Sequence, residues 1–198
     1  MSDRKDNLDY LLEYGIDLER RIVYMHGDIE FGASEIIRKI LKYWESKSIE
    51  DPITIDINSM GGDLYDAMSI VDSIKTCRCP IITIVSGASM SGASLISVCG
   101  DRRLATENSS FMLHELSSWE SDRHSIVKSS IKYNDELMER MYRIYEENSK
   151  IQKRELKEKM LKDWFLTAQE AFDRGLIDEI LPSIGILSKQ IKNTKDGE

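Results

Sequence analysis

The sequence predicts an α/β fold in which βαβ units build a largely parallel sheet. Short β-branched apolar runs alternate with amphipathic stretches through residues 21–100, a pattern typical of parallel strands joined by helices. Two of the predicted strand-to-helix turns contain glycine, which suits tight backbone turns. The chain has 198 residues, of which 41% are hydrophobic, so we expect residues 1–198 to form one domain with a sizeable core.

The first half of the chain supplies three strands and two helices. Each strand is rich in isoleucine and valine, whereas each helix repeats apolar residues every three or four positions. The N-terminal segment, 1–14, is charged, and the only regular element expected there is a short helix at Leu8–Tyr14. The predicted strands are Arg21–Met25, Ile53–Ile57 and Ile81–Val85, and the predicted helices cover Ile36–Trp44 and Leu64–Ile74.

The stretch Gly87–Ala93 follows the third strand and precedes a helix expected over 91–98. Its small residues predict a tight turn, so a serine of this stretch would lie at a helix N-terminus. There, free N–H groups and the helix dipole can stabilise a developing oxyanion. This turn is therefore a plausible place for a nucleophilic serine, although serines at such a turn are more often helix caps.

A second glycine turn, Gly61–Gly62, follows the neighbouring strand. Parallel strands end at the same edge of a sheet, where open α/β folds place their sites. We expect the two turns to present two backbone N–H groups to one oxygen, which would form an oxyanion hole.

The second half of the chain is mainly helical. A long amphipathic helix over 123–148 follows two short strands, and Gly175 suits the C-terminal cap of the last helix. The residues 185–198 are polar and are expected to form a loose tail. The remaining predicted elements are strands at Arg103–Ala105 and Ser110–His114 and helices at about 152–161 and Ala168–Arg174.

The composition excludes several classes of function. A net charge of −8 and a pI near 5.1 argue against nucleic-acid binding, which needs a basic surface. The three cysteines, Cys77, Cys79 and Cys99, form no C-x-x-C pair, so neither a zinc site nor a disulfide framework is expected. We expect reduced thiols, a cytoplasmic location, and no metal or cofactor.

One uncharged stretch, Pro80–Gly100, is long enough to span a bilayer. Its serines and glycines fit a buried strand and helix better, so no membrane association is expected. The N-terminus also lacks the apolar core of a signal peptide.

The chain offers three histidines as general bases. His114 and His26 each follow a predicted strand and could project from the sheet edge, whereas His124 lies near the start of the long helix. A lone histidine is more often a structural hydrogen-bonding residue. Asp163 is a candidate to orient a histidine, but from the residues alone an exposed acid at a helix end is the more frequent explanation.

Four motifs in order resemble the ClpP family, the proteolytic subunits of caseinolytic (Clp) proteases. The resemblance extends from about Gly15 to Pro182. The motifs are Ile57–Gly62 (Ile-Asn-Ser-Met-Gly-Gly), Gly87–Ala93 (Gly-Ala-Ser-Met-Ser-Gly-Ala), Phe111–His114 (Phe-Met-Leu-His) and Asp163–Asp178, which begins Asp-Trp-Phe-Leu-Thr-Ala.

The resemblance implies a serine endopeptidase that hydrolyses peptide bonds of unfolded proteins or peptides. Ser91, rather than Ser89 or Ser94, matches the nucleophile. His114 matches the general base and Asp163 the acid that orients it. Gly62 and Gly92 match the residues whose N–H groups form the oxyanion hole. The implied chemistry is acyl transfer through an acyl-enzyme.

The resemblance also implies a ClpP/crotonase-like superhelix of βαβ units and an assembly. The helical region 119–160 would be a handle that joins two heptameric rings into a double-ring tetradecamer with a closed chamber. A ring-shaped unfoldase ATPase would be the partner. Met60 replaces the family's usual proline and Lys162 its usual arginine, which indicates a divergent member.

Three alternatives stay open. A crotonase-type acyl-CoA hydratase or isomerase shares the paired N–H groups but uses glutamates as acid and base. A Ser-Lys peptidase would need a catalytic lysine, and none is evident. A modulatory ClpP-like ring subunit without its own activity is disfavoured by the intact set of serine, histidine and aspartate.

Overall fold

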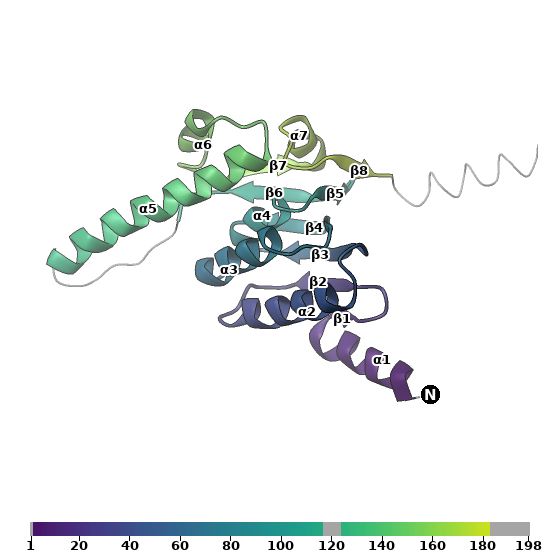
Figure 1. The fold of residues 1–198 in the computed structure, drawn as a ribbon. Coiled ribbons are helices and arrows are strands. Elements are labelled where there is room, and N and C mark those ends of the chain that lie inside the picture. The colour runs from purple at the N-terminus through teal and green to yellow at the C-terminus, as the bar shows by residue number, and fades with distance from the viewer. Residues whose placement is uncertain (1, 117–123, 183–198) are drawn as a thin grey trace, which may run out of the picture.

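A computed structural model of the protein describes residues 2–116 and 124–182, and Figure 1 shows how their helices and strands are arranged. The expected tail at 185–198 lies outside the described residues. The strands are β1 (Ile16–Asp17), β2 (Ile22–His26), β3 (Ile53–Ser59), β4 (Ile81–Met90), β5 (Arg102–Thr106), β6 (Ser110–Leu113), β7 (Trp164–Thr167) and β8 (Glu179–Leu181). The helices are α1 (Ser2–Tyr14), α2 (Ala33–Lys47), α3 (Leu64–Lys75), α4 (Gly92–Ser97), α5 (His124–Asn148), α6 (Lys153–Lys159) and α7 (Ala168–Asp173).

The strands of the described residues form one sheet with the order β1-β2-β3-β4-β5-β8. Along this path, neighbouring strands from β2 to β8 are parallel, and the edge strand β1 pairs antiparallel with β2. A branch leaves this path at the end of β4, where β6 pairs parallel with β4 and β7 pairs antiparallel with β6. The predicted α/β class with a largely parallel sheet is confirmed.

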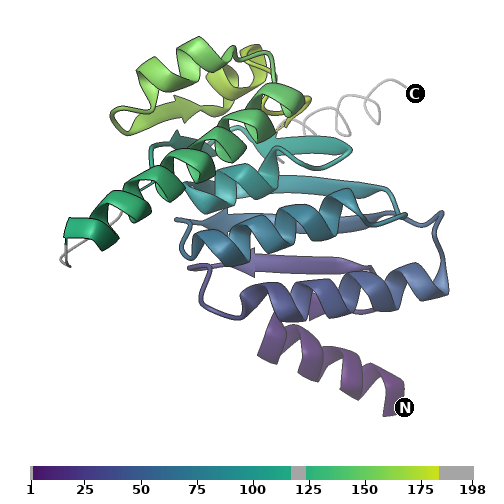
Figure 2. The same ribbon diagram turned by 60° about the vertical axis from the view of Figure 1, so that its left-hand side comes forward.

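Helices α2, α3 and α4 lie side by side along one face of the sheet (Figure 2). The alternation of β3 explains this arrangement, because Ile53, Ile55 and Ile57 share one face and are fully buried. Thr54 and Asp56 point to the other face and stay partly exposed. The core therefore lies between the sheet and these helices, and α5 contacts it next to α4.

Strand β4 is longer than predicted. The expected tight turn over Gly87–Ala93 is wrong for its first part, because the strand continues to Met90 and the turn is confined to Ser91. The reason is a change of partner: Ile82–Val85 pair with β5, and Ala88–Met90 pair with β6. The side chain of Asn58 also accepts a hydrogen bond from the Ala88 N–H at 3.0 Å, which bridges the break.

Four further differences concern helix α1 and three short strands. Helix α1 covers Ser2–Tyr14 rather than the short helix expected at Leu8–Tyr14. Strands β1, β7 and β8 were not predicted. They contain two, four and three residues, respectively, too few to give a periodic signal of their own.

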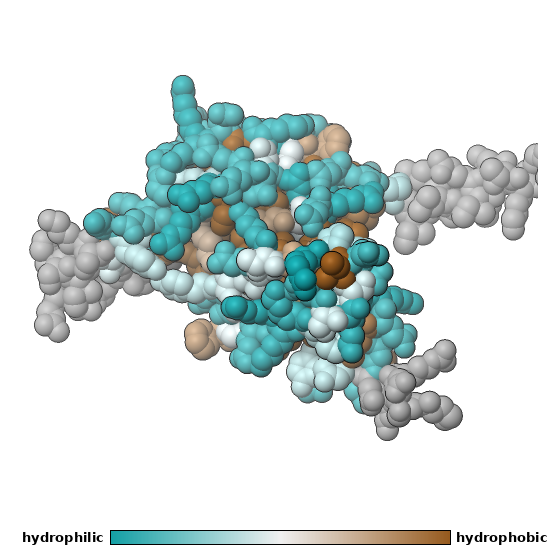
Figure 3. Space-filling view, in the orientation of Figure 1, coloured by the Kyte–Doolittle hydropathy of each residue, from teal (hydrophilic) through white to brown (hydrophobic). Residues whose placement is uncertain are grey.

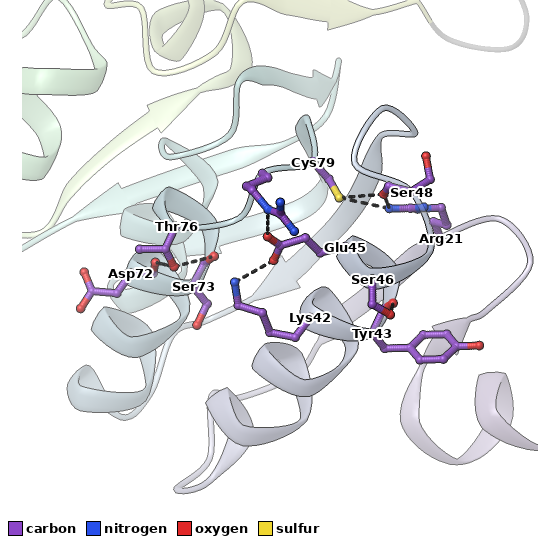
Figure 4. A network of polar contacts seen from close by, with 11 residues as sticks. Arg21, Lys42, Tyr43, Glu45, Ser46, Ser48, Asp72, Ser73, Thr76 and Cys79 are labelled. Atoms are coloured by element: carbon purple, nitrogen blue, oxygen red, sulfur yellow. Dashed lines mark hydrogen bonds and ion pairs between the residues drawn. The ribbon is translucent and has the colours of Figure 1, made fainter.

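The polar network of Figure 4 lies at the amino end of β4. Glu45 of α2 accepts hydrogen bonds from Lys42 Nζ at 2.7 Å and from Arg78 Nε at 2.5 Å. These two bonds, that of Lys42 first, lower the pKa of the Glu45 carboxyl. Cys79 donates to the Ser48 carbonyl at 3.2 Å. Because Cys79 precedes β4 and Ser91 follows it, this network is remote from the candidate nucleophile.

Hydrophilic residues cover most of the surface seen in Figure 3, and hydrophobic ones show mainly near its middle. The uncharged stretch Pro80–Gly100 is accounted for by β4 and α4. Among the residues that the structure describes, no helix has the length and apolar character needed to cross a membrane.

Candidate active site

Ser91 forms the junction between β4 and α4. Its backbone has φ 53° and ψ −125°, a conformation that residues with a side chain rarely adopt. The side chain makes no capping hydrogen bond to α4, so the simpler interpretation of Ser91 as a helix cap does not hold. The Ser91 N–H donates to the Met112 carbonyl at 2.9 Å, which ties the turn to β6.

His114 contacts the Ser91 side chain directly. The distance from His114 Nε2 to Ser91 Oγ is 2.7 Å, within hydrogen-bonding range. The parallel register of β4 and β6 produces this contact, because Met90 pairs with Met112 and both side chains follow shortly after. The His114 side chain is 23% exposed, so solvent reaches part of the ring.

Asp163 lies on the other side of the imidazole. Its Oδ1 is 3.3 Å from His114 Nδ1, within ion-pair distance. Asp163 directly precedes β7, and the antiparallel pairing of β6 with β7 brings it opposite His114. The carboxylate is 58% exposed, so water also reaches it.

Gly62 is held beside Ile29. The Ile29 N–H donates to the Gly61 carbonyl, and the Asp63 N–H donates to the Ile29 carbonyl, each at 2.7 Å. Gly62 has φ 146°, and a Cβ at this position would lie 2.3 Å from the Ile29 oxygen. Only glycine therefore fits this close approach.

The N–H groups of Gly62 and Gly92 are available at the same place. A Cβ built on Gly92 would lie 3.9 Å from the Gly62 nitrogen, so the two turns are close neighbours. Among the backbone hydrogen bonds of turns and loops in the described ranges, neither of these N–H groups is a donor. Two neighbouring backbone N–H groups beside Ser91 are what an oxyanion hole would require.

The other candidates of the sequence lie elsewhere. His26 Nε2 is 3.1 Å from Asp56 Oδ1 on the face of the sheet that the helices leave open. His124 begins α5, and its side chain lies outside the described residues. The buried Ser89 donates to Ser97 Oγ at 2.9 Å. Of the three histidines, the described structure brings only His114 to Ser91.

Two contributions to the site were not predicted from the sequence. Ile29 supports Gly62 through its backbone, and Met112 accepts the Ser91 N–H through its carbonyl. Both contributions come from main-chain atoms, so the identity of the side chain carries no signal for them.

A serine hydroxyl, an imidazole and a carboxylate lie in hydrogen-bonding order at the carboxyl end of β4. On an α/β fold, this geometry is typical of hydrolases that use a serine nucleophile for acyl transfer. Comparison with known proteins gives the family. The Clp protease family matches residues 9–183 of the chain.

Two curated relatives belong to this family. The ATP-dependent Clp protease proteolytic subunit 1 of Rhodopirellula baltica is 32% identical over 171 residues, an alignment that covers 83% of this chain and 73% of the relative. The ATP-dependent Clp protease proteolytic subunit of Deinococcus radiodurans is 29% identical over 170 residues, which cover 83% of this chain and 81% of the relative.

A solved structure has the same fold. A ClpP1 mutant from Listeria monocytogenes aligns with a TM-score of 0.77 and 26% sequence identity, over 84% of this chain and 94% of that chain. The chain therefore belongs to the Clp protease family and is a protease of the Clp proteolytic subunit type. These similarities do not favour the crotonase-type alternative.

Proposed function

We propose that the protein is a serine endopeptidase with Ser91 as nucleophile, His114 as general base and Asp163 as the acid that orients the base. The observation that carries the proposal is the 2.7 Å contact between His114 Nε2 and Ser91 Oγ. A serine hydroxyl is a weak nucleophile by itself, and a hydrogen-bonded base is what activates it.

In the proposed acylation step, Ser91 Oγ attacks the carbonyl carbon of a peptide bond while its proton moves to His114 Nε2. The N–H groups of Gly62 and Gly92 donate to the oxyanion of the tetrahedral intermediate. His114 then gives its proton to the leaving amine, the C–N bond breaks, and an ester between substrate and Ser91 remains.

In the deacylation step, water takes the place of the leaving amine. His114 removes a proton from the water, whose oxygen attacks the ester carbonyl. When the second tetrahedral intermediate collapses, the proton returns to Ser91 Oγ and the carboxylic acid product leaves. Asp163, 3.3 Å from His114 Nδ1, fixes the imidazole tautomer and stabilises the imidazolium in both steps.

The assembly implied by the resemblance belongs to the same proposal. We infer a heptameric ring or a double-ring tetradecamer whose chamber encloses the sites, with a ring-shaped unfoldase ATPase as partner, in the cytoplasm. The names of the two curated relatives, proteolytic subunits of ATP-dependent proteases, support an ATPase partner. The amphipathic helix α5 is the element that would join two rings.

Hydrolysis of fluorogenic peptides and of an unfolded protein tests the proposal, with light scattering on the same samples. Wild-type protein should cleave both, and Ser91→Ala should cleave neither at unchanged oligomeric size. Ser86→Ala is the matched control, because this serine lies in the same strand and its hydroxyl contacts Asp56 instead of His114. Wild-type rates in Ser91→Ala would refute the assignment of the nucleophile.

A further inference from the structure

Tyr145 is a fully buried residue with a polar contact to the active-site turn. It lies in the last turn of α5 and is 1% exposed. Its hydroxyl oxygen is 2.6 Å from Ser94 Oγ of α4. A buried phenol needs a hydrogen-bond partner, and here the partner lies three residues after Ser91. Burial also raises the pKa of Tyr145, so its hydroxyl keeps its proton and can act as a donor.

Counting protons gives this contact a direction. Ser94 Oγ is also 2.6 Å from the carbonyl oxygen of Ser91. A carbonyl oxygen only accepts, so Ser94 gives its single hydroxyl proton to Ser91 O and must accept the proton of Tyr145. The hydrogen bonds therefore run from Tyr145 to Ser94 and from Ser94 to the Ser91 carbonyl. Each bond in such a chain polarises and strengthens the next.

The Ser91 carbonyl belongs to the same planar peptide unit as the Gly92 N–H. In a trans peptide the C=O and N–H bonds point in opposite directions, so the orientation of one fixes that of the other. Ser91 has a strained positive φ of 53°, so this peptide orientation needs other interactions to stabilise it. The Ser94 hydroxyl and the Ser94 N–H, 3.0 Å from the carbonyl oxygen, both hold it.

We propose that Tyr145 and Ser94 are positioning residues, which hold the Ser91–Gly92 peptide so that the Gly92 N–H faces the oxyanion. The inference rests on the proposed function and adds to it a residue of α5 that never touches the substrate. It assigns the buried phenol a part in stabilising the transition state, beyond its part in the core.

The two residues should differ in the size of their effects. Tyr145→Phe keeps the ring but removes the donor, so kcat should fall about three- to tenfold with KM unchanged, the loss expected from one weakened hydrogen bond. Ser94→Ala removes the bond to the Ser91 carbonyl itself and should lower kcat at least as much. The double variant should be no slower than Ser94→Ala, because Tyr145 acts through Ser94.

Tyr142→Phe is the matched control. Tyr142 lies one turn earlier in α5 and is also buried, but Lys157 Nζ lies over its ring, 5.6 Å from the ring centroid. Its conversion to phenylalanine should change neither kcat nor KM. A general loosening of α5 would instead affect Tyr142→Phe and Tyr145→Phe alike.

The rate and the end point of inactivation by a fluorophosphonate separate positioning from folding. The end point counts folded sites, whereas the rate reports how well the oxyanion is stabilised. Tyr145→Phe should reach the wild-type end point at a rate reduced about three- to tenfold. An unchanged rate and kcat in Tyr145→Phe, or additive effects in the double variant, would overturn the inference.

Two outcomes distinguish this inference from the proposed function. If the wild-type protein takes no label, the proposed function fails and the inference fails with it. If the wild-type protein is labelled and the variants react equally fast, only the inference fails. Should Tyr145→Phe not fold, the rate of Ser94→Ala decides: a wild-type rate there refutes the positioning role, and a reduced rate at full end point supports it.

Discussion

Leu113 lies directly opposite Trp164 in the antiparallel ladder of β6 and β7. His114 follows Leu113 and Asp163 precedes Trp164, so the two side chains meet across the end of this ladder, 3.3 Å apart. The register of two four-residue strands thus determines whether the imidazole has a carboxylate partner.

Asp163→Asn should retain the fold and lose most activity. An amide cannot stabilise the imidazolium and favours the wrong tautomer of His114, so kcat should fall by about 10⁴-fold, as in other triads of this type. Peptide hydrolysis by purified protein measures the loss. Asp173→Asn is the control, since this acid of α7 is exposed and accepts a hydrogen bond from Gln169, remote in sequence from His114. An unaffected rate in Asp163→Asn would move the orienting role to another group.

Gly62→Ala and Gly27→Ala form a matched pair for the proposed oxyanion hole. Both glycines have positive φ, 146° and 95°, but a Cβ on Gly62 would meet Ile29 O at 2.3 Å, whereas one on Gly27 would meet nothing within 4 Å. Gly62→Ala should therefore lower the free energy of unfolding by about 1–3 kcal/mol more than Gly27→Ala. Urea denaturation measures this difference, and equal losses would contradict the close contact.

Only Gly62→Ala should also lower kcat, because the new methyl group displaces an N–H from the oxyanion. A Gly27→Ala variant that lost activity to the same degree would show that strain alone, rather than the position of Gly62, controls turnover.

Asp66 should make stability depend on pH. Its carboxylate accepts hydrogen bonds from the N–H groups of Gly32 and Ser34 at the start of α2, at 2.9 and 2.8 Å. A hydrogen bond from the Ser34 side chain, followed by the one from Gly32, lowers the pKa of Asp66 below its ordinary value of 3.8. The folded state therefore favours the ionised form.

The sign follows from this lowered pKa. The contribution is complete above the unfolded pKa and is lost as pH falls through the lower folded value. Asp66→Asn should lower the free energy of unfolding by about 2 kcal/mol at pH 7, and this difference from wild type should shrink below about pH 4. Asp72 lies at an exposed position of α3, the helix that also contains Asp66. Asp72→Asn should therefore change the free energy of unfolding little at either pH. If the difference in stability between wild type and Asp66→Asn grew as the pH was lowered, the account would be contradicted.

The sequence predicted the parts of the fold that local patterns encode. The strand–helix alternation from β2 to α4 rests on periodic apolar residues, so the order of elements was predictable. The continuation of β4 through Met90 was not, because it depends on pairing with β6, more than twenty residues further along the chain. Strand β7 likewise gains its structure from β6.

The candidate site divides in the same way. The two glycine turns could be singled out from the sequence. The family resemblance then chose Ser91 within its turn, His114 among the histidines and Asp163 among the acids. The support from Ile29 and Met112 comes through backbone atoms, and the bond between Ser94 and Tyr145 joins residues 51 positions apart. Such contacts arise only from the folded arrangement.

The most direct test of the central claim is to map the site of fluorophosphonate labelling by mass spectrometry. The account predicts one label per chain, on Ser91, with no label in Ser91→Ala and a strongly slowed reaction in His114→Ala. Ser86→Ala should react like wild type. A label on another serine, or undiminished labelling of Ser91→Ala, would contradict the claim that His114 activates Ser91.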